Sequence, residues 1–266
     1  MKGDSIMYAD DEVDYISSCR DKINSYPEEI YYDKNSLCKK ILRVLQNECL
    51  LTARNGHDQL PPDFYSEECE IMFDAMRVND TEIEVENKKK KILLNSKFKR
   101  EKNIYKELEE LEIFNMEKCT IFCNSEYIDY CEHSIDNFFK QAQRVVEKHI
   151  KKIKIWKKEL PNIKYKGLFI FDESSVYFKG VCVPVDNTTW FFLYEGELPS
   201  VYFPWLDKNI MQQVYDSEID FIVWYSPYKK NSFARQAGIT YPSVVILDTR
   251  YPQNLVDYVY DEYELS

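Results

Sequence analysis

Polar and ionisable residues follow each strongly apolar run in the C-terminal half of the chain. Asp172 and Glu173 come directly after LFIF, Lys229 lies just beyond FIVWY, and Asp248 follows VVIL. In open α/β sheets, ligands bind outside the carboxyl ends of the strands. If these runs form neighbouring parallel strands, their polar ends meet in one crevice.

The residue types in this predicted crevice favour metal-assisted hydrolysis. Nearby carboxylates resist ionising together unless a cation lies between them, and carboxylate oxygens suit Mg²⁺ or Mn²⁺. We therefore expect Asp172, Glu173 and Asp248 to hold the ion, which would activate a water and polarise a phosphoryl group. Lys229, or alternatively Arg250, would stabilise charge in the transition state. The predicted reaction is hydrolysis of a phosphodiester.

A second group of charged residues competes with this crevice. Asp80 precedes Glu86-Asn87-Lys88, which has E-x-K spacing. This pattern resembles the restriction-endonuclease-like nucleases, whose core order is helix, three strands, helix, strand; the elements expected over 66–171 resemble that order, with an additional helix among the strands. The resemblance implies metal-dependent phosphodiester hydrolysis. Asp80 departs from the pattern because no proline precedes it and its spacing to Glu86 is short. The alternative is a charged hairpin edge that discourages aggregation.

A basic region in the middle of the chain suggests a partner for such an enzyme. Residues 88–158 contain 18 Lys and Arg against 11 Asp and Glu, whereas the whole chain has a net charge of −11. Lys and Arg that neutralise phosphates give sequence-independent affinity for nucleic acid. The alternative is that long helices simply carry charged outer faces. The residues expected to bind nucleic acid are Lys140, Arg144, Lys148, Lys151 and Lys152.

Several other classes of site are excluded by the motifs and their spacing. The chain contains six glycines and lacks G-x-x-x-x-G-K-[ST], G-x-G-x-x-G and G-x-S-x-G, which excludes P-loop, common dinucleotide-binding and α/β-hydrolase sites. Cys119 and Cys123 would lie about 13 Å apart in a strand. One zinc ion with bonds near ~2.3 Å cannot bridge that distance. We therefore interpret the cysteines as buried thiols.

The alternative to an enzyme is a non-catalytic protein that binds a protein partner through acidic, tyrosine-rich surfaces. The chain has 21 Tyr, and both of its ends are acidic and contain tyrosine. Tyrosine is enriched at interfaces because it combines apolar area with a hydroxyl group. Clustering of the strand-end carboxylates would favour the enzyme, whereas carboxylates scattered over the surface, with a large exposed aromatic patch, would favour the interaction protein.

The pattern of the whole chain predicts an α/β fold. The length of 266 residues fits one large domain or two small ones. We expect a helical N-terminal region over 1–60 and an α/β domain over 61–266, forming one continuous unit. No run of about 20 apolar residues and no secretory signal is present, so we expect a cytoplasmic protein without a membrane span.

Helices and strands alternate along the sequence, which predicts a mixed, partly parallel sheet flanked by helices. Apolar spacing and the candidate N-caps Ser36 and Ser66 place the helices, and Pro161 ends the longest one. The expected helices are 11–25, 36–54, 66–77, 96–113, 134–159 and 207–215. The expected strands are a hairpin over 81–95 and the segments 119–123, 167–171, 190–194, 221–225 and 244–247.

Overall fold

A seven-stranded mixed sheet forms the centre of the protein. The structure is a computed structural model that describes residues 6–54, 62–80, 133–179, 181–184, 190–193, 200–229, 241–251 and 253–265. The strands in sheet order are β1 (Ile30–Tyr32), β11 (Val244–Asp248), β10 (Phe221–Tyr225), β5 (Tyr165–Asp172), β4 (Ile71–Val78), β3 (Phe64–Ser66) and β2 (Thr52–Ala53). The predicted α/β class with a mixed, partly parallel sheet is confirmed.

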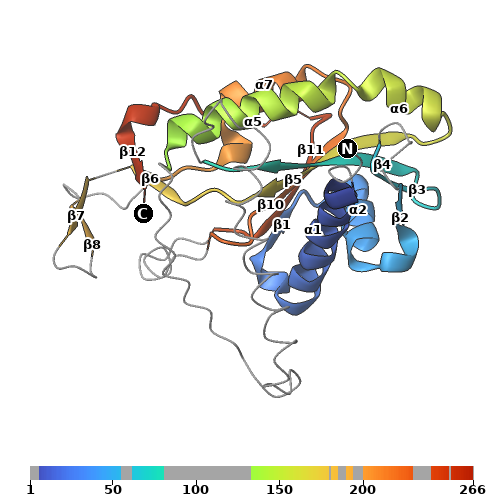
Figure 1. The fold of residues 1–266 in the computed structure, drawn as a ribbon, viewed down its shortest axis with the longest axis horizontal. Helices are drawn as coiled ribbons and strands as arrows, with labels where there is room; N and C mark the ends of the chain where they lie inside the picture. The colour runs from blue at the N-terminus through green and yellow to red at the C-terminus, as the bar shows by residue number, and fades with distance from the viewer. Residues whose placement is uncertain are drawn as a thin grey trace, which may run out of the picture.

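Helices cover both faces of this sheet (Figure 1). One face carries α5 (Ile135–Ile150), α6 (Ile153–Glu159) and α7 (Lys208–Tyr215), and the opposite face carries α1 (Ile6–Ser25) and α2 (Ser36–Gln46). Short 3₁₀ helices are η1 (Pro27–Glu29), η2 (Glu48–Leu50), η4 (Pro204–Leu206) and η5 (Tyr260–Glu262). Two small sheets consist of β12 (Tyr263–Leu265), β6 (Tyr177–Lys179) and β9 (Ser200–Val201), and of β7 (Val181–Pro184) and β8 (Trp190–Leu193).

The N-terminal region belongs to the same structural unit as the rest of the chain. Besides α1 and α2, it contributes β1 and β2, which form the two outer strands of the seven-stranded sheet. Strand β1 pairs with β11 near the C-terminus, more than 200 residues away in sequence. The region is therefore only partly helical, because its short extended segments complete the sheet.

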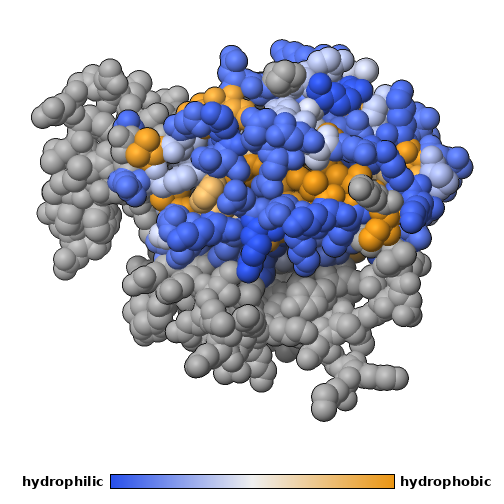
Figure 2. Space-filling view, turned by 90° about the horizontal axis from the view of Figure 1, so that it is seen from above, coloured by the Kyte–Doolittle hydropathy of each residue, from blue (hydrophilic) through white to orange (hydrophobic). Residues whose placement is uncertain are grey.

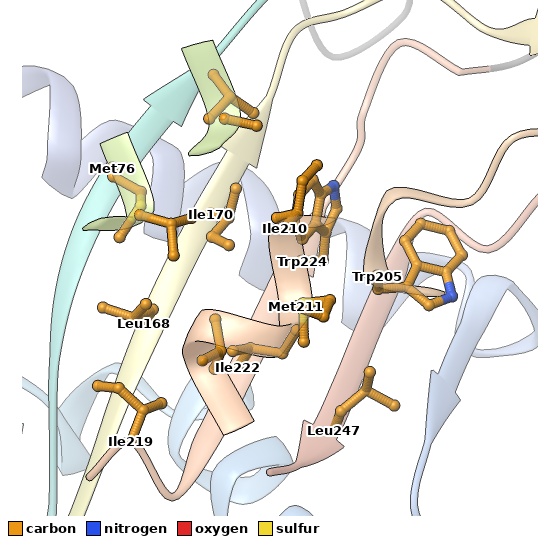
Figure 3. Packing of buried hydrophobic residues seen from close by; sticks show 14 of the residues in the cluster. Met76, Leu168, Ile170, Trp205, Ile210, Met211, Ile219, Ile222, Trp224 and Leu247 are labelled. Atoms are coloured by element: carbon orange, nitrogen blue, oxygen red, sulfur yellow. The ribbon is translucent and has the colours of Figure 1, made fainter. Parts of the chain in front are cut away.

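Alternate residues of the central strands face the two helical layers. In β4, Met72 and Met76 pack with the α5–α7 side, whereas Phe73 and Ala75 pack with the α1–α2 side. Figure 3 shows the first of these cores, in which Met211 of α7 lies among apolar side chains of the sheet. Burial on both faces explains why the central strands are nearly continuous apolar runs.

The helix predicted over 66–77 is wrong. Residues 67–70 form a turn between β3 and β4, and Glu70 has a positive φ of 54°. Ser66, which we expected to begin a helix, accepts a hydrogen bond from the Cys69 N–H within this turn. The apolar run in β4 reflects a strand buried on two faces, which apolar spacing alone does not separate from a helix.

Two other predicted helices differ at their boundaries. Helix α2 ends at Gln46 rather than continuing to residue 54, and its N-cap is Asn35, whose side chain accepts from Cys38 N–H. The long helix expected over 134–159 is interrupted at 151–152 and forms α5 and α6. The helices expected near 11–25 and 207–215 are confirmed.

Of the predicted strands, 167–171, 190–194, 221–225 and 244–247 are confirmed, each within one or two residues. The hairpin expected over 81–95, the helix over 96–113 and the strand over 119–123 lie outside the described residues. Among the helices that the structure describes, none combines the length and the apolar character needed to cross a bilayer.

Strand direction decides which loop ends share an edge of the sheet. Strands β4, β5 and β10 are parallel, so their carboxyl ends lie together. Strand β11 is antiparallel to β10, and its last residue, Asp248, pairs with Phe221 at the start of β10. The end of β11 therefore lies at the opposite edge of the sheet.

Candidate functional site

The predicted crevice at the carboxyl ends of the strands is only partly assembled. Asp172 at the end of β5 and Lys229 beyond β10 come together, with Lys229 Nζ 2.9 Å from Asp172 Oδ2 and both side chains buried. Asp248 does not join them, because β11 runs in the opposite direction. The expectation that all three strand ends meet is wrong for Asp248.

The carboxylate of Asp172 is already saturated with hydrogen-bond donors. Oδ1 accepts from the backbone N–H and the hydroxyl of Ser174, at 2.9 and 2.6 Å. Oδ2 accepts from Trp224 Nε1 and the Ser226 hydroxyl, in addition to Lys229. A carboxylate has about four lone-pair positions. Asp172 therefore has the contacts of a structural residue and offers little to a metal ion.

The other two predicted metal ligands have partners of their own. Glu173 is buried, and its Oε2 lies 3.8 Å from Arg77 Nε in the neighbouring strand β4. Asp248 accepts two hydrogen bonds from the Arg250 guanidinium, at 2.8 and 2.6 Å, and one from Asn35 Nδ2. The three carboxylates Asp172, Glu173 and Asp248 thus form no common site.

Asp80, the aspartate of the E-x-K pattern, lies buried just beyond β4. It accepts from His133 Nδ1 at 2.6 Å, Tyr177 Oη at 2.6 Å and the Ser175 N–H at 2.7 Å. Burial raises the pKa of Asp80, but these hydrogen bonds outweigh it and hold the pKa well below its usual value. The partners proposed for it, Glu86 and Lys88, lie outside the described residues.

A different carboxylate pair, which the sequence analysis missed, lies between β3 and β4. The register pairs Phe64 with Phe73, and its continuation places Asp63 opposite Asp74. Cross-strand neighbours have Cβ atoms about 4.5–5.5 Å apart, and like charges in this arrangement repel. The backbone connects the two as well, because Asp63 N–H donates to Asp74 Oδ1 at 3.2 Å and Ala75 N–H donates to Asp63 Oδ2 at 2.9 Å.

The two carboxyl groups of this pair share one proton near neutral pH. Burial and the charge of Asp74 raise the pKa of Asp63 to about 7, and a hydrogen bond to Asp74 adds to this effect. Burial alone would also raise the pKa of Asp74, but the hydrogen bond from His149 and the charge of Lys152 lower it. Perturbed pKa values of this kind cluster at functional sites.

Two side chains from the end of α5 and the following turn reach the Asp74 carboxylate. His149 Nδ1 lies 2.7 Å from Asp74 Oδ2, and Lys152 Nζ lies 3.4 Å from the same oxygen. The Lys152 side chain is 32% exposed, so this side of the pair opens toward the surface. Both side chains lie at the C-terminal end of α5 or just after it, where the partial negative charge of a helix end favours cations.

The five basic residues predicted to bind nucleic acid lie along α5 and the turn after it. Lys140 forms an ion pair with Asp136, and Lys151 lies 2.6 Å from Glu147 Oε1, one turn earlier in each case. Lys152 contacts Asp74. The remaining two, Arg144 and Lys148, are exposed. These basic residues therefore lie along the helix, and the last of them, Lys152, contacts the carboxylate pair.

Two features of the sequence could have indicated the Asp63–Asp74 pair. Asp74 interrupts the apolar run of β4, and an ionised side chain in a strand buried on both faces requires partners. Asp63 directly follows Pro62 at the start of another strand.

Comparison of the chain with protein families, curated proteins and solved structures gave no match.

Proposed function

We propose that this protein is a metal-dependent phosphodiesterase that acts on nucleic acid, with its site at Asp63, Asp74 and Lys152. The observation that carries the proposal is the Asp63–Asp74 pair, in which a half-buried and a fully buried carboxyl group lie opposite each other across β3 and β4 with a lysine beside them. Like-charged groups in this position cost stability unless a proton or a cation separates them. The strand-end carboxylates do not cluster, so the Asp63–Asp74 pair alone favours an enzyme over the alternative of a non-catalytic interaction protein.

The donor set fits a hard divalent cation. Carboxylate oxygens are the preferred ligands of Mg²⁺ and Mn²⁺, and Mg²⁺ commonly uses only one or two carboxylates together with water and substrate phosphate. Within the described residues, no group of three or more His, Cys, Asp or Glu is arranged to hold a metal ion. The proposal therefore assigns only two protein ligands, Asp63 and Asp74, and leaves the other positions to water and substrate phosphate. A bound ion at such a site lowers the pKa of a water and polarises a phosphoryl group.

Lys152 supplies a positive charge on the open side of the pair. Its amine lies 3.4 Å from Asp74 Oδ2, and about a third of its side chain is exposed. This position allows the amine to neutralise charge that develops on phosphoryl oxygens during hydrolysis, in a partly buried place where such an interaction is strong. Lys152 therefore takes the role that the sequence analysis gave to Lys229.

The resemblance to the restriction-endonuclease-like core does not carry this proposal. The helix expected to begin that order, over 66–77, is instead a turn followed by β4, and the hairpin, helix and strand expected between residues 81 and 123 lie outside the described residues. The proposal therefore depends on the Asp63–Asp74 pair and on Lys152.

Nucleic acid is the partner that this site and its surroundings fit. Arg144 and Lys148 are exposed on α5, within two turns of Lys152. Figure 2 looks onto the face that carries α5 to α7, where hydrophilic residues predominate around a hydrophobic band. A polyanionic backbone that contacts these basic residues would reach the carboxylate pair at the end of the helix.

Cleavage assays with labelled single-stranded DNA, duplex DNA and RNA, each with Mg²⁺ or Mn²⁺, test the proposal. We expect cleavage by the wild-type protein and a loss of at least 100-fold in Asp63→Asn, Asp74→Asn and Lys152→Met. The matched control is Asp216→Asn, which changes an exposed aspartate at the end of α7. If the wild type neither cleaves nor binds Mn²⁺, the enzyme proposal fails and the interaction protein is favoured. If Asp172→Asn alone abolishes cleavage in a folded protein, the site is misassigned.

A further inference from the structure

His149 occupies a position on α5 where an apolar residue would be expected. The other buried residues of the helix are Ile135, Phe138, Ala142 and Val146, and His149 continues this stripe. Its side chain is 11% exposed, and a buried imidazole costs free energy unless it finds a partner. The partner is Asp74 on β4, so the helix and the strand are joined by a polar contact inside an otherwise apolar layer.

The contact holds one particular oxygen of Asp74. His149 donates to Oδ2 at 2.7 Å, while the backbone N–H of Asp63 donates to Oδ1 at 3.2 Å. An ionised carboxylate only accepts hydrogen bonds, so Nδ1 carries the proton in this pair. The second side-chain torsion of aspartate is broad, and donors on both oxygens restrict it. The carboxylate plane is therefore held by one donor from the strand layer and one from the helix.

Lys152 cannot replace His149 in this role. It reaches the same Oδ2 at 3.4 Å, which is long for a hydrogen bond between charged groups, and it does so from the end of a flexible, partly exposed side chain. A short bond from a ring fixed in the buried stripe defines direction better than a distant amine. The amine also remains available for a substrate phosphate.

From this geometry we propose that His149 is a positioning residue, which orients the Asp74 carboxylate so that Asp63 and Asp74 together can hold a divalent cation. The inference rests on the proposed function, because it assigns Asp74 as a metal ligand. His149 acts through Asp74 and contacts neither metal nor substrate. Partners that orient metal-ligating side chains typically change metal affinity by about 10–100-fold when they are removed.

Two substitutions separate orientation from simple packing. His149→Leu removes the donor while keeping an apolar side chain in the stripe. His149→Asn keeps a donor, because the Asn amide nitrogen is as many bonds from the backbone as Nδ1, and Asn and His have similar helix propensity. His149→Phe serves as a second variant without a donor if the leucine variant does not fold.

The chain also offers a matched control for losing a buried Asp–His contact. His133 Nδ1 lies 2.6 Å from Asp80 Oδ1, with a side chain 13% exposed, at a place that the proposal does not involve. His133→Leu therefore removes a contact of similar length and burial from a different carboxylate. Any effect that both leucine variants share reports on folding rather than on the metal site.

Binding of Mn²⁺ at pH 8, measured by electron paramagnetic resonance on the full chain, tests the inference without relying on activity. We expect the affinity to fall about 10–100-fold in His149→Leu and to stay within about threefold of the wild type in His149→Asn and His133→Leu. Circular dichroism confirms that each variant is folded.

Each other outcome overturns a distinct part of the reasoning. If the wild type and all variants fail to bind Mn²⁺, the proposed function itself fails. If the wild type binds and folded His149→Leu or His149→Phe binds equally well, the metal site stands and the positioning role is refuted. If His133→Leu weakens binding as much as His149→Leu does, or His149→Asn does not restore it, the effect comes from packing and the role is again refuted.

Discussion

The shared proton of the Asp63–Asp74 pair makes a quantitative prediction about stability. The pKa of Asp63 is raised to about 7 by burial and by Asp74, whereas an aspartate in an unfolded chain titrates near ~3.9. Between these values the folded protein keeps a proton that the unfolded chain has lost. The stability that this proton contributes is complete below the unfolded pKa and is lost as the pH rises through the folded pKa.

The size of the effect follows from the pKa. One pKa unit corresponds to about 1.36 kcal/mol, and about two units separate pH 5 from the pKa of Asp63. The free energy of unfolding should therefore fall by about 2.7 kcal/mol between pH 5 and pH 8 through this group alone. The pKa of Asp74 is lowered, so Asp74 is ionised throughout this range and adds no slope.

The substitution Asp63→Asn imitates the protonated side chain permanently. The Asn carbonyl can still accept from Ala75 N–H, and the Asn amide can donate to Asp74 in place of the proton. We therefore expect the stability advantage of the variant over the wild type to grow by about 2–3 kcal/mol between pH 5 and pH 8, because the wild type loses this stability over that range and the variant does not. Urea denaturation of both proteins at each pH, with EDTA present to remove divalent ions, measures this difference.

Two results would refute this reasoning. A stability difference between variant and wild type that stays the same at pH 5 and pH 8 would show that Asp63 does not hold a proton in the folded state. A variant that is less stable than the wild type at pH 8 would show that the ionised pair is favourable. Asp216→Asn, at an exposed position, controls for the general effect of removing one negative charge.

Two further predictions concern the central strands, and urea denaturation measures both. Lys229→Met should lower the free energy of unfolding by about 3 kcal/mol, because it leaves the buried Asp172 carboxylate without its ion-pair partner. A loss below about 1 kcal/mol would show that the other hydrogen-bond donors are enough to stabilise the carboxylate. Gly167→Ala should lower the free energy of unfolding by about 1–3 kcal/mol, because an added Cβ would lie 2.2 Å from the Phe221 ring. An unchanged free energy of unfolding would show that this ring moves aside freely.

Local sequence patterns predicted the α-helices and four of the twelve strands that the structure describes. Apolar runs of strand length placed β5, β10 and β11, and apolar spacing placed α1, α5, α6 and α7. Apolar runs and apolar spacing predict these elements because each element must bury its own apolar side chains, wherever it lies in the fold. Strand β4 was predicted as a helix, because burial on both faces removed the alternation that distinguishes a strand from a helix. The short strands β1, β2, β3, β6, β7, β9 and β12 were not predicted.

The candidate site was much less predictable. The sequence analysis grouped Asp172 and Asp248 because each follows an apolar strand, but the direction of β11 separates them. Asp63 and Asp74 instead meet through a turn that was expected to be helical, and Lys152 reaches Asp74 from 78 residues away. Strand direction, register and helix placement depend on contacts between distant segments, which no local pattern contains.

The amino-acid sequence by itself therefore determined the α/β class, the strands β5, β10 and β11, the helices and the basic character of α5, because these depend on residue type and local spacing. Only the tertiary structure decided which carboxylates face each other. Asp172 and Asp74 are both buried aspartates of central strands, and both accept several hydrogen bonds, yet Asp172 lies opposite Val78 whereas Asp74 lies opposite a second carboxyl group. That difference arises from the neighbours that folding brings together, and it distinguishes a structural residue from a candidate ligand.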